Sequence, residues 1–289
     1  MISCKLCGGL GNQLFQIFTA IAHALKYSKP FFFLNNHQLG DGSNGVTIRY
    51  TYWKTFLSSL TPFLKNMNKI PKLMFITEKT NFHYDEIPGN LGNSCGTLLV
   101  GYFQSPKYFD RYKESICKII NLDLKKKMVK EISNIDFTNN QFISVHFRFD
   151  DYKNHPDLFR ILTEKYYINS INYILSEIKY NSKLSILYFC QDVSIKEVED
   201  IIKKLELEFP LIKFERANPL LKDWEQMLLM SLCHHNIIAN STFSWWGAYF
   251  NSNVDKIVCY PEKWYMPNTH NTRDLFLDEW VPISITESI

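Results

Sequence analysis

The chain has 289 residues, of which 46% are hydrophobic and 15% aromatic, so it can bury the cores of roughly two domains. Its net charge of +3 is too small to indicate a nucleic-acid partner. No secretory pattern opens the chain, and no apolar run approaches the ~20 residues that span a bilayer. We therefore expect a cytoplasmic protein without an integral membrane segment, with peripheral membrane association left open.

The N-terminal half is expected to combine strands and helices. A short apolar run at residues 2–7 predicts a strand, and the apolar period that begins at Leu14 predicts a helix. Further strands are predicted at residues 30–34 and 95–103. Residues 51–93 are aromatic and interrupted by prolines, which indicates irregular structure. A lysine run follows this half and is expected on the solvated face of a charged helix: Lys125, Lys126 and Lys127.

Strands and helices alternate more regularly in the C-terminal half. The predicted strands are 142–147, 184–189, 211–214, 236–239 and 257–260, and the predicted helices are 163–180, 194–205, 223–233 and 242–250. Such alternation is typical of a parallel sheet covered on both faces. Ligands of such sheets bind outside the carboxyl ends of the strands. His234 and His235 follow a predicted helix, and we expect a cation site at its end.

A polar stretch at residues 134–140 separates the two halves. We therefore predict an N-terminal domain over residues 1–138 and a C-terminal domain over residues 139–289.

Residues 8–13 read Gly-Gly-Leu-Gly-Asn-Gln and lie between the first predicted strand and helix. Glycines let the backbone approach a ligand closely, and a helix N-terminus offers N–H groups and partial positive charge. A phosphate-bearing ligand is one interpretation, and a plain tight turn is the other. The spacing differs from Gly-x-Gly-x-x-Gly, and no acidic residue follows the second predicted strand. Both observations argue against a dinucleotide oxidoreductase.

A second group of polar residues follows the strand predicted at 142–147. His146 and Arg148 share one face of that strand because side chains alternate. Arginine can hold a diphosphate through two parallel charge-assisted hydrogen bonds. Asp151 can orient the arginine or accept a proton. An ordinary ion pair at the strand end is the structural alternative.

A third group, residues 240–248, reads Asn-Ser-Thr-Phe-Ser-Trp-Trp-Gly-Ala and opens a predicted helix. Small polar side chains here can bind phosphate oxygens or simply cap the helix; they are Asn240, Ser241, Thr242 and Ser244. The two tryptophans are expected in the core. The chain has no Asp-x-Asp, no His-x-x-x-His and no second Cys-x-x-Cys to pair with the one at residues 4–7, so no metal site is expected.

Together these stretches resemble the α-1,2-fucosyltransferase family. That family carries a Gly-Gly-Leu-Gly-Asn-Gln start, a His-x-Arg-Arg-x-Asp-Tyr strand end and an Asn-Ser-(Ser/Thr)-Phe-Ser-Trp-Trp-Gly-Ala segment. The matches here stand at residues 8–13, 146–152 and 240–248, in the same order. One departure is visible, because Phe149 occupies the place of the second arginine. This departure puts the usual acceptor or the placement of the donor in doubt.

The resemblance implies a GT-B-like α/β fold of two facing Rossmann-like domains with parallel sheets. The N-terminal domain would carry the glycine loop and the acceptor side, and the C-terminal domain would bind the GDP-sugar. The implied enzyme is an inverting galactoside 2-α-L-fucosyltransferase. It would move L-fucose from GDP-β-L-fucose to the 2-hydroxyl of a galactose-terminated oligosaccharide, with no metal or other cofactor.

The resemblance also implies roles for individual residues. Arg148 would stabilise the departing diphosphate, and His146 would orient the donor. Asp151 would act as the base, with Asp150 and His155 as the alternatives. The donor-binding residues would be Gly9, Gly11, Asn12, Gln13, Asn240, Ser241, Thr242 and Ser244.

Two alternatives stay open. The first is a transferase for another GDP-deoxyhexose, since Phe149 is expected to alter the donor pocket. The second is a non-catalytic protein that binds a glycan or a sugar nucleotide. Retention of Arg148, Asp151 and Asn12 argues against the second, and release of GDP from the donor would distinguish a catalyst from a binder.

Overall fold

The computed structural model describes residues 1–40, 48–70, 72–89, 95–149, 151–178, 184–266 and 270–284. The chain divides into two compact units. Unit 1 comprises Met1–Lys125 with His270–Leu277, and unit 2 comprises Lys126–Thr269 with Asp278–Ile289. The division falls inside helix α3 (Leu122–Ser133), ahead of the polar stretch in which the boundary was predicted.

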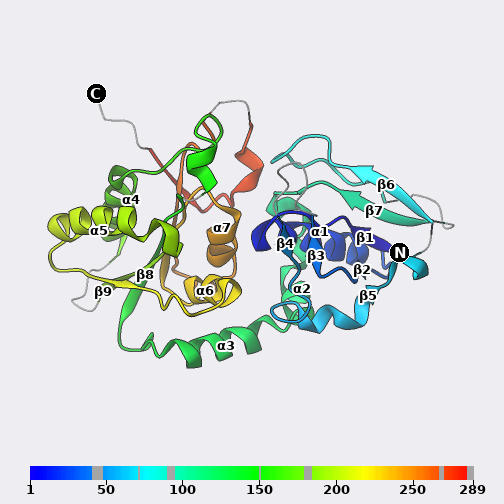
Figure 1. Ribbon diagram of the computed structural model, residues 1–289, viewed down its shortest axis with the longest axis horizontal. Helices are drawn as coiled ribbons and strands as arrows, with labels where there is room; N and C mark the ends of the chain where they lie inside the picture. Colours follow the sequence, from blue (N-terminus) through cyan, green and yellow to red (C-terminus); the bar gives the residue numbers. More distant parts are fainter. Residues whose placement is uncertain are drawn as a thin grey trace. The chain divides into compact units, whose positions relative to one another are not determined.

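Unit 1 is built around helix α1 (Leu10–Lys26), which packs on strand β1 (Ile2–Cys4) (Figure 1). Phe15 and Phe18 of this helix are fully buried, and both rings contact Phe109 edge-on. The buried residues of α1 include polar ones such as Gln13, Gln16 and Thr19. The helix is therefore buried on more sides than the apolar stripe that predicted it.

The strands of unit 1 are mostly parallel. Strand β7 (Gly96–Val100) lies between β1 and β6 (Leu73–Thr77), and β2 (Phe33–Leu34) pairs with β5 (Leu64–Lys65). The other elements are short: β3 (Gln38–Leu39), β4 (Arg49–Tyr50), η2 (Ser58–Phe63), η3 (Met67–Lys69), η4 (Pro106–Tyr108), η5 (Asp110–Tyr112), α2 (Lys113–Ile119) and η8 (Arg273–Leu275). Strand β6 lies in the region predicted to be irregular, so that prediction was wrong there.

The segment His270–Leu277 belongs to unit 1 although it follows most of unit 2 in the chain. Asp274 holds it there. Its carboxylate accepts a hydrogen bond from the Tyr84 N–H at 2.9 Å and pairs with Lys107 and with His83 Nδ1. Burial acts to raise the pKa of Asp274, but the hydrogen bonds from Lys107 and Tyr84 outweigh it and lower that pKa.

Unit 2 contains a parallel six-stranded sheet in the order β10-β9-β8-β11-β12-β13. Its strands are β8 (Gln141–His146), β9 (Leu184–Phe189), β10 (Lys213–Arg216), β11 (His235–Ile237), β12 (Val258–Pro261) and β13 (Val281–Ile283). Counted from β8, the order is 3-2-1-4-5-6, which is that of a dinucleotide-binding Rossmann fold. The order in which the chain adds strands reverses between β8 and β11: β9 and β10 extend the sheet on one side of β8, and β11 to β13 extend it on the other. The predicted α/β class with parallel sheets is confirmed.

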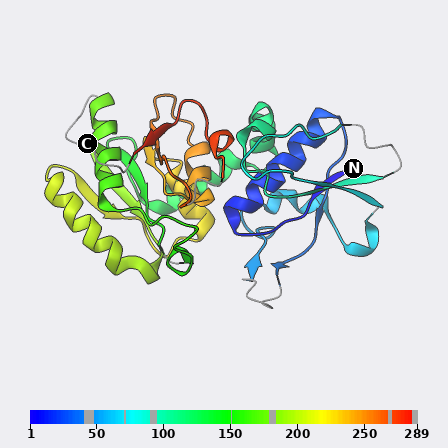
Figure 2. The same ribbon diagram turned by 90° about the horizontal axis from the view of Figure 1, so that it is seen from above.

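Helices cover both faces of this sheet. Helices α4 (Glu164–Glu177) and α5 (Ile195–Glu208) lie on one side, and α6 (Asp223–Met230) and α7 (Thr242–Tyr249) lie on the other (Figures 1 and 2). A short 3-10 turn, η6 (Asp151–Asn154), follows β8, and η7 (Asp192–Ser194) leads into α5. Within the described parts of the chain, no helix has the length and apolar character needed to cross a membrane.

Two predictions about charged residues were wrong. Lys125 is buried, where its ammonium donates to the Ile120 carbonyl at 3.0 Å, and Lys126 donates to the Phe250 carbonyl at 3.0 Å. Long lysine stems can cover apolar surface while the ammonium finds a carbonyl. Only Lys127 of the run is fully exposed.

The histidine pair does not end a helix. Helix α6 stops at Met230, and His235 begins strand β11. His234 Nδ1 accepts from the Phe142 N–H and His235 Nδ1 from the Ile257 N–H, each at 3.1 Å. An imidazole nitrogen that accepts a hydrogen bond is unprotonated. Burial lowers the pKa of His235 to about 4, so the expected cation site is absent from this pair.

Candidate active site

The carboxyl ends of β8 and β11 lie side by side at the point where the sheet order reverses. The two strands pair in parallel with Ile143 opposite His235 and Val145 opposite Ile237. His146 is the last residue of β8, and residues 240–248 begin three residues after β11 ends. Ligands of doubly wound sheets bind in the crevice at this reversal. The structure thus brings together two of the three groups identified in the sequence.

Side chains after β8 alternate as predicted. Phe147 and Phe149 point into the core, where Phe147 packs 4.3 Å from the Tyr167 ring and Phe149 is only 4% exposed. His146 lies on the opposite face, with its ring 5.5 Å from that of Phe243 in α7. The phenylalanine therefore faces away from His146 and Arg148, and the expectation that Phe149 alters the donor pocket stays a prediction.

His146 is buried and uncharged at neutral pH. His146 is 5% exposed. Burial, and to a smaller extent the nearby Arg148 cation, lowers its pKa to about 3. Its Nδ1 has no hydrogen-bond partner among the described residues. A neutral imidazole offers one hydrogen-bond donor and one acceptor.

Arg148 is half-buried and lies against an aromatic ring. Its guanidinium carbon is 5.4 Å from the centre of the Tyr152 ring. Tyr152 is buried, donates its hydroxyl to the Asn240 carbonyl at 2.6 Å, and stacks on Phe159 with ring centres 4.1 Å apart. Tyr152 is not among the site residues predicted from the sequence.

Asn240 connects three segments of unit 2. Its amide nitrogen donates to the Arg160 carbonyl at 2.9 Å and to the Trp264 carbonyl at 3.1 Å, and the residue is 1% exposed. Its Oδ1 has no partner in the described chain. This buried amide holds the backbone around the strand ends.

The hydroxyl residues after Asn240 divide into two kinds. Ser241 caps α7 by accepting from the Phe243 N–H at 3.3 Å, and Ser244 donates to the Ala239 and Ser241 carbonyls at 3.4 and 3.3 Å. Thr242, the first residue of α7, is half-exposed. Trp245 and Trp246 are fully buried, which confirms the core prediction. The start of α7 therefore offers backbone N–H groups and the Thr242 side chain beside the strand ends.

The glycine loop belongs to unit 1 and is shaped by its own side chains. Gly8 has a φ of +76°, and a Cβ there would lie 2.5 Å from the Asn12 amide nitrogen. Gly9 is extended and caps α1, with open space where a Cβ would be. Only glycine adopts the Gly8 conformation without strain. The loop therefore presents the start of α1 through backbone geometry, as its sequence predicts.

The polar residues of this loop mostly face inward. The Gln13 amide is buried and donates to the Gly8 and Tyr50 carbonyls at 3.0 Å. Asn12 is half-buried, and its Oδ1 accepts from the Gln104 amide at 2.8 Å. Gly11 is buried in the first turn of α1. Among the predicted donor-binding residues of unit 1, Gly9 and Asn12 are the more accessible.

The carboxylates after β8 can be placed only in part. Asp151 begins η6, but its side chain lies outside what the structure describes, as does the whole of Asp150. His155 follows η6 and is exposed. In the described chain, no three His, Cys, Asp or Glu side chains cluster as metal ligands would.

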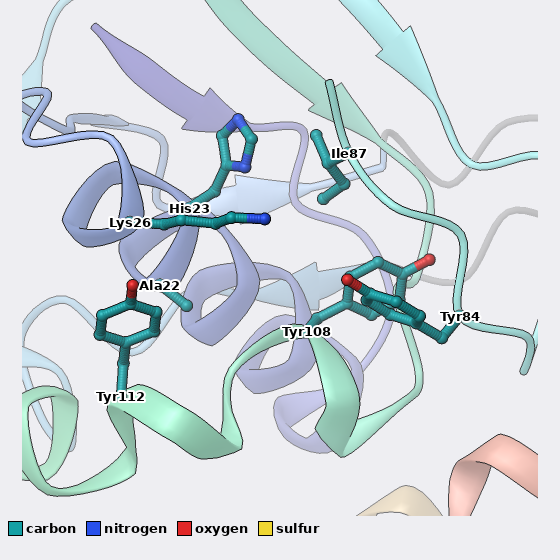
Figure 3. Close-up of a pocket in the computed structure, with 7 residues that line it drawn as sticks. All are labelled: Ala22, His23, Lys26, Tyr84, Ile87, Tyr108 and Tyr112. Carbon is teal, nitrogen blue, oxygen red and sulfur yellow. The ribbon is translucent and has the colours of Figure 1, made fainter. Parts of the chain in front are cut away.

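A shallow recess lies elsewhere in unit 1, at the C-terminal end of α1. Figure 3 shows its seven lining residues, which are Ala22, His23, Lys26, Tyr84, Ile87, Tyr108 and Tyr112. The 1.5 Å rise per residue places His23 ~20 Å along the helix from the glycine loop. The recess contains none of the predicted site residues, so we place the candidate site at the strand ends of unit 2.

Comparison with known proteins yields one family match and several similar proteins. The model of Glycosyl transferase family 11 matches residues 65–284. An α-1,2-colitosyltransferase of Escherichia coli is 27% identical over 98% of this chain and 99% of its own length. The O-antigen biosynthesis glycosyltransferase WbnK, also of Escherichia coli, is 29% identical over 97% and 99%.

Two solved fucosyltransferase structures also match, at low identity. A mutant of Arabidopsis thaliana FUT1 in complex with GDP matches 92% of this chain and 71% of its own, at 10% identity and a TM-score of 0.49. NodZ from Bradyrhizobium matches 86% and 90%, at 12% identity and a TM-score of 0.46. Because both TM-scores are below 0.5, assignment to a family rests on the sequence matches.

Proposed function

The chain belongs to glycosyl transferase family 11, as its motifs indicate, and is a glycosyltransferase. From this premise we propose that it moves L-fucose from GDP-β-L-fucose to the 2-hydroxyl of a terminal galactoside, with inversion to an α-1,2 linkage. One observation carries the proposal. His146 and Arg148 share a face at the end of β8, beside the start of α7 and at the reversal of the sheet order.

In the proposed reaction the acceptor oxygen attacks the anomeric carbon of the sugar. The bond from that carbon to the diphosphate breaks, and its electron pair leaves with GDP. Arg148 and the N–H groups at the start of α7 stabilise the negative charge that develops on the diphosphate, in place of a metal. The proton of the acceptor hydroxyl passes to a base, for which we propose Asp151.

The neutral state of His146 supports a binding role for this side chain. An imidazole with a pKa near 3 stays unprotonated throughout the physiological range. A neutral imidazole can hydrogen-bond to a hydroxyl of the donor. In unit 1, we propose that Gly9, Gly11 and Asn12 contact substrate through the backbone at the start of α1.

A second donor has specific support from one relative. The α-1,2-colitosyltransferase of Escherichia coli, which matches 98% of the chain, is named for the transfer of colitose, another deoxyhexose. The core position of Phe149 gives no reason to prefer either sugar, since this side chain faces away from Arg148. GDP-L-colitose is therefore the alternative donor.

The test is release of GDP from each donor in excess EDTA, with and without lactose or N-acetyllactosamine. Acceptor-stimulated release from GDP-L-fucose, with an α-1,2-linked product by NMR, is the expected result. Release of GDP from GDP-L-colitose alone would replace fucose by colitose in the proposal and leave the proposed type of reaction unchanged. Binding of both donors without any release of GDP would contradict a transferase.

A further inference from the structure

We infer that Tyr152 is a positioning residue that holds Arg148 in its working orientation and ties it to the end of β11. The inference rests on the proposed function in one respect, because it takes Arg148 as the group that binds the diphosphate of the donor. Tyr152 itself need not touch the substrate. It acts through two contacts, one made by its hydroxyl and one by its ring.

The hydroxyl contact joins the two strand ends of the candidate site. Tyr152 lies in η6, after β8, and its hydroxyl donates to the Asn240 carbonyl at 2.6 Å. The residue is 8% exposed, so this hydrogen bond has little competition from water. Asn240 in turn immediately precedes the cap of α7. The hydrogen bond therefore fixes the segment that carries Arg148 relative to the N–H groups of α7.

The ring contact acts on the guanidinium. Arg148 lies 5.4 Å from the Tyr152 ring centre, which is within the range of a cation–π interaction. The ring is itself held, because Phe159 stacks on it with planes 8° apart and centres separated by 4.1 Å. Phe159 forms a backbone bridge with Tyr265 and packs against its ring. A ring fixed in this way restricts the arginine before the donor binds, which lowers the entropy lost on binding.

The variants Tyr152→Phe and Tyr152→Leu separate the two contacts, since the first keeps the ring and the second removes it. Tyr166→Phe is a matched control. The Tyr166 hydroxyl is also buried and donates to a carbonyl on the same segment, that of Ile238, at 2.6 Å, but Tyr166 belongs to helix α4 and to the core. A purely structural role of Tyr152 predicts that all three variants lower Tm without changing the affinity for GDP.

The measurement is the dissociation constant of GDP by calorimetry, with Tm from thermal unfolding beside it. We expect Tyr152→Leu to weaken GDP binding roughly three- to thirtyfold, the range of a cation–π contact that is partly to fully desolvated. Tyr152→Phe should weaken it less, and Tyr166→Phe should leave it unchanged. Unchanged affinity in Tyr152→Leu would overturn the inference.

A double-mutant cycle with Arg148→Ala tests whether Tyr152 acts through the arginine. If it does, Tyr152→Leu has no further effect on GDP affinity once Arg148 is absent. Additive losses would overturn the inference and leave the proposed function intact. Unchanged affinity in Arg148→Ala alone would instead contradict the diphosphate role in the proposed function.

Phe159→Leu provides a second route if Tyr152→Leu fails to fold. It removes the stacking partner of Tyr152 and leaves the hydroxyl contact in place. A smaller loss of GDP affinity that disappears in the Arg148→Ala background supports the same conclusion. A loss of Tm with unchanged GDP affinity would contradict it.

Discussion

The glycine loop of unit 1 and the strand ends of unit 2 both lie at the start of a helix, but different interactions hold their backbones in place. In unit 1 the loop depends on side-chain amides, with Gln13 and Gln16 buried and bonded to its backbone. In unit 2 the corresponding backbone is already fixed by the parallel pairing of β8 and β11. The comparison teaches that unit 1 fixes its loop through side-chain hydrogen bonds, whereas unit 2 fixes the segment before His146 and Arg148 through strand pairing.

The largest effect is expected in unit 2. Arg148→Ala should reduce transfer by two to three orders of magnitude, because it removes the main cation for the leaving diphosphate, while Tm changes little. Initial rates of GDP release, with thermal unfolding as the control for folding, measure this. A variant with normal turnover would show that the diphosphate is held elsewhere.

In unit 1 the matched pair Gly8→Ala and Gly9→Ala sharpens the comparison. Gly8→Ala should destabilise the protein by about 1–3 kcal/mol, because a Cβ at φ +76° is strained and would collide with Asn12. Gly9→Ala should be nearly neutral for stability, since open space surrounds the added carbon. Denaturant unfolding of both variants measures the difference, and equal effects would contradict the described loop.

Loss of a shaping amide should affect stability more than chemistry. The Gln16 side chain accepts from the Cys7 N–H and donates to the Gly101 carbonyl, each at 3.0 Å. Gln16→Leu leaves both groups unsatisfied and should lower the free energy of unfolding by about 1–3 kcal/mol. GDP affinity by calorimetry should stay near that of the unaltered protein, and a loss larger than tenfold would give this residue a binding role.

The buried histidines of unit 2 predict a smaller, pH-dependent effect. The pKa values of His146 and His235 are lowered to about 3 and about 4, so both stay neutral in the folded state while the unfolded chain protonates below pH 6.5. Their contribution is complete above pH 6.5 and is lost as pH falls toward those values, by up to about 1.4 kcal/mol per histidine and pH unit. Denaturant unfolding at pH 7 and pH 5.5 checks the slope. His235→Gln keeps an acceptor for the Ile257 N–H but cannot titrate, so it should reduce this slope, by at most one proton.

The smallest effect is expected from metal removal. Because Arg148 and backbone N–H groups are proposed to stabilise the diphosphate, excess EDTA should leave the rate of GDP release unchanged. A complete loss that Mg²⁺ restores would contradict the proposal and imply a metal site that the motifs do not reveal.

The regular alternation of strands and helices made most of unit 2 predictable from sequence. Short or unusual elements were not predictable in this way. The expected strands at 142–147 and 184–189 correspond to β8 and β9. Strand β13 has only three residues with a proline in the middle, which weakens any strand signal. Strand β6 was missed because its apolar residues lie in a stretch broken by prolines and rich in aromatics.

The types of residue at the site were predictable, but their hydrogen bonds were not. The motif identified Asn240, yet its amide bonds to carbonyls 80 and 24 residues away in the chain. Phe149 was expected near the donor, and only the strand geometry shows that it faces the core. Such partners depend on tertiary packing, which no local pattern encodes.

The return of residues 270–277 to unit 1 has a genetic consequence. Neither compact unit is one uninterrupted stretch of the coding sequence, since unit 1 includes His270–Leu277 and unit 2 resumes at Asp278. A gene fragment that ends at Lys125 would lack Asp274 and its contacts with Lys107 and Tyr84. A fragment covering only 126–269 would lack β13 at the edge of the sheet. Cutting the coding sequence at any single point would therefore deprive at least one unit of part of its structure.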